Sequence, residues 1–294
     1  MHLSENEILK RVRRVEIKTR GLSDEIFAGK YHTAFRGRGM SFAEVREYRV
    51  GDDVRDIDWN VTARSERTHV KVYEEERELT MMLLVDVSPS RMFGSKELTK
   101  KNMITEVAAT LAFSAAKNND KVGCILFSDR VEKFIPPKKG RSHILTIIRE
   151  LVGYDATGSA TNISEALRYL VGVNKKRTTA FLLSDFIDSE GDVERMEDAL
   201  KIASSKHDIM AIRVFDERER TLPDVGIVEF RDAETRRSEW LDTSSRRVRE
   251  YWQREYDQRH EQINAMLSRN RVDVADVATD GDFVAELIKM FKQR

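Results

Sequence analysis

From about residue 79 to the carboxyl terminus, strongly apolar runs alternate with longer stretches of helical periodicity, and this alternation constrains the fold more than any other feature. The apolar runs, among them "TMMLLVDV" and "TTAFLLSD", are nearly continuous, as expected for strands that are covered on both faces. Strands and helices in alternation are typical of a parallel sheet with helices on its two sides. The sequence therefore predicts an α/β fold with a doubly wound, mainly parallel sheet.

The individual elements follow from the same periodicity. The expected strands are residues 80–87, 121–128, 179–185, 208–215 and 272–277, and the expected helices are residues 98–117, 142–151, 163–171, 193–205, 244–267 and 283–291. Residues 130–137 are predicted as an antiparallel edge strand, because Pro136 and Pro137 cannot donate hydrogen bonds to a neighbouring strand. A second hairpin is expected at residues 226–242.

The amino-terminal part shows a different pattern, with a period of two in short pieces at residues 41–50, 56–63 and 68–76. We expect a small antiparallel β unit, in which Trp59 is a packing anchor. Ahead of it, Ile8, Val12 and Val15 share one face of a predicted amphipathic helix. The chain is accordingly divided into an amino-terminal unit at residues 1–78 and a main domain at residues 79–294.

The composition limits the classes of partner that we expect and indicates the cellular compartment. Lysine plus arginine and aspartate plus glutamate both number 51, so the net charge is zero and provides no overall attraction to nucleic acid or anionic lipid. The single cysteine, Cys124, excludes an internal disulfide and favours a reducing compartment. No segment approaches the roughly 20 apolar residues that span a bilayer. We predict a cytoplasmic protein with no integral membrane segment and no nucleic-acid partner.

Polar side chains gather where the expected strands end. Asp86, Ser88 and Ser90 alternate directly after the first strand, Thr161 precedes a helix, and Asp185 ends a later strand. Because ligands of doubly wound sheets bind beyond the carboxyl ends of the strands, these side chains should meet at one edge. All are hard oxygen donors, the type that Mg²⁺ prefers, with Mn²⁺ as a second candidate.

Each of these motifs also has a purely structural interpretation. Aspartate and serine are common in turns, where they bond to their own backbone. Asn162 and Glu165 have the spacing of a helix cap, and Asp185 could cap the helix that follows it. The combination favours the metal site, because three loops bring oxygen donors to one edge and no histidine or thiolate joins them.

Three segments resemble the loops of a metal-ion-dependent adhesion site in a von Willebrand factor type A domain. They are "DVSPS", "GSATNISEAL" and "LLSDF". The resemblance implies a Rossmann-type fold in which Asp86, Ser88 and Ser90 supply the first loop of metal ligands, Thr161 the second and Asp185 the third. It also implies that an acidic residue of a partner protein completes the coordination.

Upstream, "GRGMSFAEVREYRVGDDVRDIDWNVTAR" and "HVKVYEEERE" resemble the signature of the bacterial domain-of-unknown-function family 58. This resemblance implies a MoxR-type AAA+ ATPase as the protein partner. Two positions depart from the usual A-domain pattern. Arg91 follows Ser90 where an apolar residue is usual, and "SDFID" has Phe186 where many A domains have glycine after the third-loop aspartate.

Motifs of catalysis are missing from the sequence, which has no Walker-type phosphate loop, no Gly-x-Ser-x-Gly elbow and no His-Glu-x-x-His pair. We therefore expect a binding module and not an enzyme, with a metal that leaves one coordination position for a partner's carboxylate. Two alternatives stay open. One is a metal-dependent hydrolase that activates water at the ion, and the other is a structural A-like domain whose site stays empty.

Overall fold

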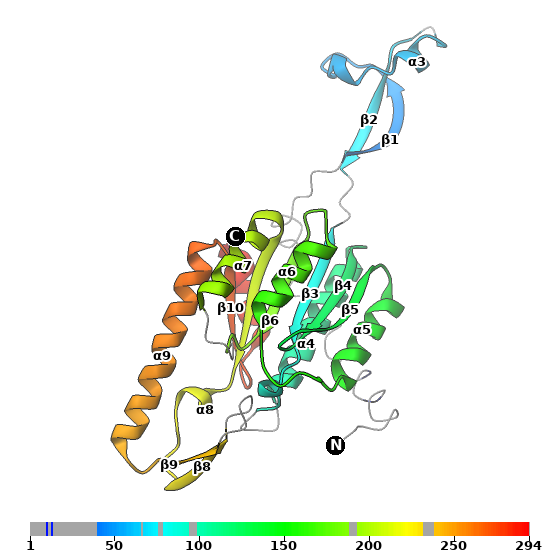
Figure 1. Ribbon diagram of the computed structural model, residues 1–294. Helices are drawn as coiled ribbons and strands as arrows, with labels where there is room; N and C mark the ends of the chain where they lie inside the picture. Colours follow the sequence, from blue (N-terminus) through cyan, green and yellow to red (C-terminus); the bar gives the residue numbers. More distant parts are fainter. Residues whose placement is uncertain are drawn as a thin grey trace. The chain divides into compact units, whose positions relative to one another are not determined.

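The computed structural model describes residues 40–65, 67–75, 79–93, 99–187, 193–231 and 238–293, together with Lys10 and Arg13 (Figure 1). It separates into two compact units, one spanning Phe35–Leu79 and the other including Thr80–Arg294. The helix predicted around Ile8, Val12 and Val15 lies outside the described residues. None of the helices in the described ranges combines the length and the apolarity that crossing a membrane requires.

The larger unit is built on a six-stranded sheet in the order β10-β7-β6-β3-β4-β5. Its strands are β3 (Thr80–Asp86), β4 (Lys121–Phe127), β5 (Val131–Lys138), β6 (Thr179–Ser184), β7 (Asp208–Phe215) and β10 (Asp273–Ala278). All neighbours pair in parallel except β5, which pairs antiparallel with β4 at the edge. The predicted doubly wound, mainly parallel sheet is confirmed, including its proline-containing edge strand.

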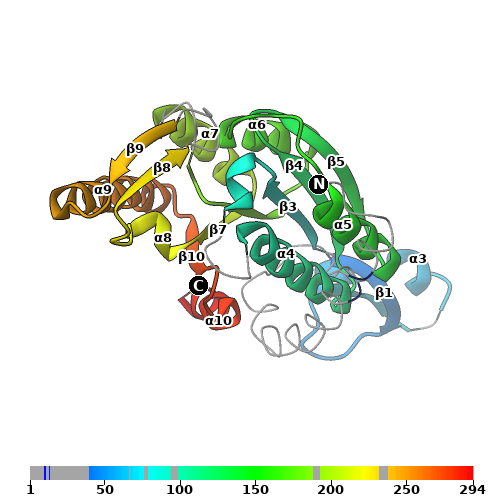
Figure 2. The same ribbon diagram turned by 90° about the horizontal axis from the view of Figure 1, so that it is seen from below.

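Helices cover both faces of this sheet, as Figure 2 shows. On one face lie α6 (Ile163–Val173), α7 (Val193–Lys206) and α9 (Arg246–Arg269), and on the other lie α4 (Lys100–Lys117), α5 (Arg141–Gly153) and α10 (Phe283–Gln293). Burial on both sides leaves residues 81–86 of β3 at most 2% exposed. The chain that leaves this strand is therefore still inside the protein.

The smaller unit pairs β1 (Met40–Glu47) with β2 (His69–Glu75) in an antiparallel ladder, which confirms the small β unit. The strand expected at residues 56–63 is wrong, because these residues contain the short helix α3 (Trp59–Thr62). The Asp58 carboxylate accepts hydrogen bonds from the backbone of Asn60 and Val61 and so begins that helix. Trp59 is 67% exposed, so the expectation that it anchors a core is also wrong.

The segment after β7 forms a short helix and a β-hairpin that lie outside the six-stranded sheet. It comprises the short helix α8 (Glu217–Arg220), which the sequence did not predict, and the expected hairpin of β8 (Ile227–Arg231) and β9 (Ser238–Asp242). The hairpin packs on α9, since the rings of Phe230 and Trp252 meet edge to face at 4.8 Å between centroids. Trp252 Nε1 also donates to the carbonyl of Glu219 at 2.8 Å. The rings and this bond tie α8, α9 and the hairpin together.

Close packing of β4 against β5 requires a glycine. A Cβ atom on Gly123 would lie 2.6 Å from Met82 Sδ and 3.0 Å from both Ile135 O and Pro137 N. We expect Gly123→Ala to lower the free energy of unfolding by about 1–3 kcal/mol. Gly172→Ala in α6 is the matched control, because nothing lies within 4 Å of a Cβ there and alanine favours helices by about 1 kcal/mol. Urea denaturation compares the two, and equal stabilities would contradict this packing.

Candidate metal site

The first predicted loop is a connected, buried group of side chains. Asp86 ends β3, and its Oδ1 accepts a hydrogen bond from Ser88 N at 2.8 Å. The hydroxyls of Ser88 and Ser90 lie 2.9 Å apart, with Ser90 inside the 3-10 turn η2 (Pro89–Met92). The exposed fractions of Asp86, Ser88 and Ser90 are 2%, 0% and 8%. The Asp-x-Ser-x-Ser alternation therefore brings three oxygen donors together beyond the end of the central strand.

The third predicted loop lies beside the first, because β6 pairs in parallel with β3. Ser184 Oγ donates to Asp86 Oδ2 at 2.6 Å and links the ends of the two strands. Asp185 follows, is 8% exposed, and accepts a hydrogen bond on Oδ1 from Ile187 N at 3.0 Å. The structure thus brings Asp86 and Asp185 to the same edge.

The second predicted loop approaches from the other side of β3, at the end of β4. Asn162 N donates to Ser128 O at 2.8 Å, which holds the loop to that strand end. Thr161, next to it, is fully buried. Asn162 also caps α6, since its Oδ1 accepts from Glu165 N at 3.0 Å, and the capping interpretation of this residue is confirmed. The three predicted loops therefore lie at the ends of three neighbouring strands, although the second of them follows α5 in the chain.

Negative charge at this edge is energetically disfavoured. Burial, and to a smaller extent the nearby charge of Asp185, raise the pKa of the Asp86 carboxyl from its ordinary 3.8 to about 6. Hydrogen bonds from Ser184 and Ser88 act in the opposite direction but do not outweigh burial. A cation at this edge would stabilise both carboxylates.

One such cation is already part of the chain, and the sequence reasoning missed it. Lys100 is the first residue of α4, and its side chain is 1% exposed. Its Nζ donates to Asp185 Oδ2 at 2.7 Å and to Glu219 Oε1 at 2.5 Å. Burial opposes the charge on Lys100, but the two carboxylates outweigh it and raise the pKa of this lysine. Nothing in the sequence distinguishes Lys100 from its neighbour Lys101.

Glu219 brings a further carboxylate close to the predicted site, from the unpredicted helix α8. Burial raises its pKa, although Lys100 pulls it in the other direction. Its Oε2 accepts from Asp216 N at 3.1 Å and caps α8. Asp185 and Glu219 both line a cavity of about 30 Å³, which is large enough to hold a water molecule. The cavity is also lined by residues of β7 and α9, including Arg213, Tyr256 and His260.

Arg91, noted as a departure from the A-domain pattern, is a second buried cation. It is 5% exposed, and its Nη2 donates to Tyr154 O at 2.5 Å. Burial lowers the pKa of Arg91 to about 10, while Asp86 and Asp155 attract its charge and oppose that shift. Arg91 therefore joins η2 to the loop that leads to Thr161.

Glu132 of β5 holds the same loop by accepting several hydrogen bonds. Its Oε1 accepts from Ser128 Oγ at 2.7 Å and from Gly158 N at 2.7 Å, and its Oε2 accepts from Thr157 Oγ1 at 2.8 Å. Partial burial opposes the charge, but these donors hold the pKa of Glu132 below its usual value. A Cβ on Gly158 would collide with Ser128 Oγ, so the loop needs glycine at this point.

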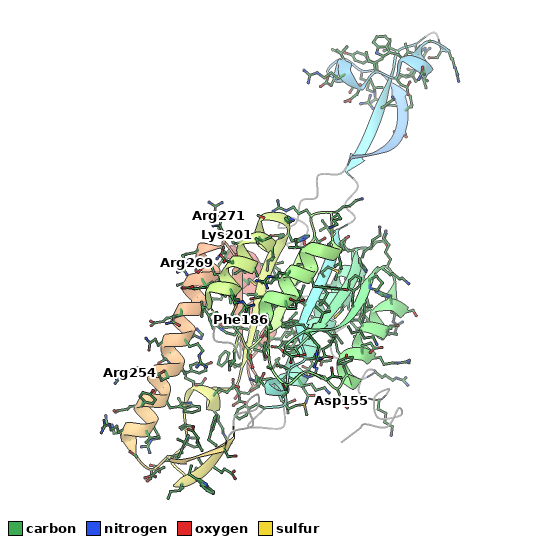
Figure 3. All side chains as sticks on the ribbon, viewed as in Figure 1. Asp155, Phe186, Lys201, Arg254, Arg269 and Arg271 are labelled. Carbon is green, nitrogen blue, oxygen red and sulfur yellow. The ribbon has the colours of Figure 1, made fainter. Side chains whose placement is uncertain are left out.

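Phe186, the second departure from the A-domain pattern, adopts the backbone conformation that glycine usually has. Its φ is +60°, in the left-handed region that favours glycine. The residue is only 1% exposed and belongs to the core cluster beneath α6 and α7, in the interior of the unit (Figure 3). Phe186 N donates to Ser184 Oγ at 3.0 Å. Burial of the ring and this bond offset the backbone strain, which is typically about 1–2 kcal/mol.

The donor set at this edge fits a small, hard divalent cation. Within the described ranges, no three histidine, cysteine, aspartate or glutamate side chains are arranged to hold a metal ion, so a metal here would depend on hydroxyls as well as on two carboxylates. Magnesium accepts such oxygen ligands and usually keeps several waters. Asp86, Ser88, Ser90, Thr161 and Asp185 are the residues that would hold it, and their role as ligands stays a prediction.

Fold and site together define an α/β protein with an oxygen-rich edge at the carboxyl ends of a mainly parallel sheet. Over residues 44–262 the chain matches the family described as "Protein of unknown function DUF58". The chain belongs to this family. A Mycobacterium tuberculosis protein named "Uncharacterized protein Rv1480" is 30% identical over 226 residues, which cover 76% of this chain and 70% of that protein.

Two solved structures align with most of the chain. One is described as an aerotolerance-related membrane protein from Bacteroides fragilis, with a TM-score of 0.49, 15% identity, and coverage of 74% of this chain and 100% of that chain. The other is a von Willebrand factor type A structure from Catenulispora acidiphila, with a TM-score of 0.42, 11% identity, and coverage of 77% and 43%. The family assignment rests on the sequence matches.

The raised pKa of Asp86 predicts that the free energy of unfolding of the metal-free protein depends on pH. The unfolded carboxyl ionises near pH 3.8 and the folded one near pH 6, so the folded state favours the protonated form. Stability from this group is fully present below about pH 4 and is lost as the pH rises to about 6. Between pH 4 and 6, the unfolding free energy of Asp86→Asn should therefore rise relative to that of wild type by on the order of 2 kcal/mol.

Guanidinium denaturation in EDTA between pH 4 and 7 measures that difference. The exposed residue Asp198 of α7 provides the control variant Asp198→Asn, for which we expect no such trend. A stability difference between Asp86→Asn and wild type that does not change with pH would contradict the electrostatic cost assigned to Asp86.

The hydrogen bonds of Glu132 predict a local effect on the second loop. Glu132→Ala leaves the donors of Ser128, Thr157 and Gly158 without their acceptor, and we expect a loss of about 1–3 kcal/mol in unfolding free energy. Amide exchange at Thr157 and Gly158 should accelerate. Glu165→Ala, at an exposed position of α6, is the control. Unchanged exchange at these two amides would show that Glu132 does not hold the loop.

Proposed function

We propose that this chain is a metal-dependent protein-interaction module that binds an acidic group of a partner. The observation that carries the proposal is the convergence of buried oxygen donors from three loops, centred on the carboxylates of Asp86 and Asp185. Burial and the neighbouring charge of Asp185 disfavour the charge of Asp86, which is the condition under which a divalent cation binds well. The proposed ion is Mg²⁺, with Mn²⁺ as the second candidate.

The proposed binding mode follows from the small number of charged ligands. Asp86 and Asp185 supply negative charge, while Ser88, Ser90 and Thr161 contribute neutral oxygens, directly or through water. At most two carboxylates of this chain face the divalent ion. The ion therefore stays electrophilic enough to accept a carboxylate from a partner. Recognition would then require both the metal and an acidic residue of the partner.

A neighbouring surface supports a protein as the partner. The β8–β9 hairpin lies at the end of the larger unit where β3, β6 and β7 end (Figure 1). Ile227 and Trp240 of this hairpin are 69% and 70% exposed, which is unusual for side chains of this size. A partner that places a carboxylate at the metal could cover these side chains as well. We further propose a MoxR-type AAA+ ATPase as that partner, and the cytoplasm as the location.

Lys100 favours a second candidate function. Its ammonium already supplies positive charge to Asp185, so the edge could remain stable without a metal. In that case the chain would be an interaction module whose contacts do not depend on divalent ions.

Calorimetric titration of Mg²⁺ distinguishes these candidates. We expect saturable binding near one ion per chain, lost in Asp86→Ala and unchanged in the control Asp198→Ala. The MoxR-type ATPase from the same genome, immobilised on beads, should retain the wild-type chain in Mg²⁺ and release it in EDTA. Asp86→Ala should not be retained.

The contrary results separate the two parts of the proposal. Absence of metal binding at millimolar Mg²⁺, with the ATPase still bound in EDTA, would support the metal-independent module. Metal binding without retention by the ATPase would remove that ATPase as the partner and leave the metal site intact.

A further inference from the structure

The ammonium of Lys100 occupies the position of a shared counter-ion between two carboxylates. It lies 2.7 Å from Asp185 Oδ2 and 2.5 Å from Glu219 Oε1, and it faces the ring of Phe93 at 5.9 Å from the centroid. The side chains of Lys100 and Asp185 are 1% and 4% exposed, and that of Glu219 is 15% exposed. The lysine charge is therefore almost fully removed from water.

This location opposes two ordinary preferences of lysine. Lys100 is the first residue of the 18-residue helix α4, where the helix dipole disfavours positive charge. Lysine is also rarely buried, because removal of its charge from water is costly. The two carboxylates offset these costs. The whole arrangement holds a positive charge directly against Asp185, one of the predicted metal ligands.

Charge around the site is nearly balanced without any bound ion. Asp86, Asp185 and Glu219 carry three negative charges when ionised, and Lys100 and Arg91 carry two positive charges. A divalent ion added to this group would leave an excess of positive charge while the ammonium still contacted Asp185. Repulsion between the ion and an ammonium several ångströms away amounts to a few kcal/mol at the effective dielectric of a partly buried site.

We propose that Lys100 is a tethered cation that competes with the metal for Asp185. In the metal-free chain, its ammonium stabilises Asp185 and Glu219 together. When a metal binds, the ammonium leaves Asp185 and keeps Glu219, and the cavity bounded by these two carboxylates provides adjacent space. Lys100 thereby sets the metal concentration at which the site fills. This inference rests on the proposed metal-binding function and identifies a residue that controls it.

The test compares Mg²⁺ affinity among variants by calorimetry. We expect Lys100→Met to bind Mg²⁺ at least about tenfold more tightly than wild type, because one competing charge is removed. The double variant Lys100→Met with Glu219→Gln restores the net charge of the wild type, and glutamine can still cap α8. It should also bind more tightly, since Asp185 is no longer occupied by the ammonium.

Two controls accompany these variants. Lys117→Met removes an exposed lysine at the other end of α4, and its Mg²⁺ affinity should equal that of wild type. In EDTA, Lys100→Met should unfold at a lower urea concentration than wild type, because Asp185 and Glu219 lose their counter-ion. Millimolar Mg²⁺ should narrow that gap, since at a given metal concentration the chain that binds the ion more tightly is stabilised more.

The possible outcomes distinguish the competition from the proposed metal-dependent function. If wild type binds Mg²⁺ and both Lys100 variants bind it equally or more weakly, the competition is overturned and the proposed metal site stands. If only the Lys100 variants bind, the competition is supported, and metal-dependent function of the native chain is overturned. If none of the chains binds Mg²⁺, both proposals fall.

Discussion

The burial of charge at the end of the central strand is the constraint on which the organisation of this protein depends. Between β4 and β6, and under helices on both faces, β3 has no exposed end from which Asp86 could reach water. A carboxylate in such a place must be hydrogen-bonded or paired with a cation. The neighbouring segments meet this need. Ser184 of β6 and the amide of Ser88, which precedes η2, donate to Asp86, and Lys100 of α4 donates to the adjacent Asp185.

Residues outside the predicted ligand set position the loops that carry it. Glu132 and Arg91 attach the second loop to β5 and to η2, and Trp252 ties α8, which carries Glu219, to α9. These contacts connect the polar edge, through α8 and α9, to the hairpin that exposes Ile227 and Trp240. A partner that approaches this edge would meet oxygen donors and apolar side chains together, a combination that is common in protein interfaces. Farther along α9, Arg254 extends from the outer side of the helix into solvent (Figure 3).

Much of the fold could be predicted because both faces of its strands are buried. Near-continuous apolar runs located β3, β4, β6 and β7, and helical periodicity located the helices between them within a few residues. The prediction failed at residues 56–63, where alternation over a few residues resembles a strand but the Asp58 side chain starts a helical turn. Short alternating segments are ambiguous because a local hydrogen bond can outweigh the preference for a strand.

The α/β class, the family and the positions of Asp86, Ser88, Ser90, Thr161 and Asp185 could be inferred from the chain alone, because periodicity and motif spacing are local properties. Which charges meet at the edge of the sheet depends instead on how the chain folds. Lys100 and Glu219 are 119 positions apart, and Lys100 and Asp185 are 85 apart. No local pattern records such contacts, since they arise when β6 and β7 bring their following loops beside the start of α4. The counter-ion of Asp185, and with it the proposed control of metal binding, is therefore a property of the folded chain.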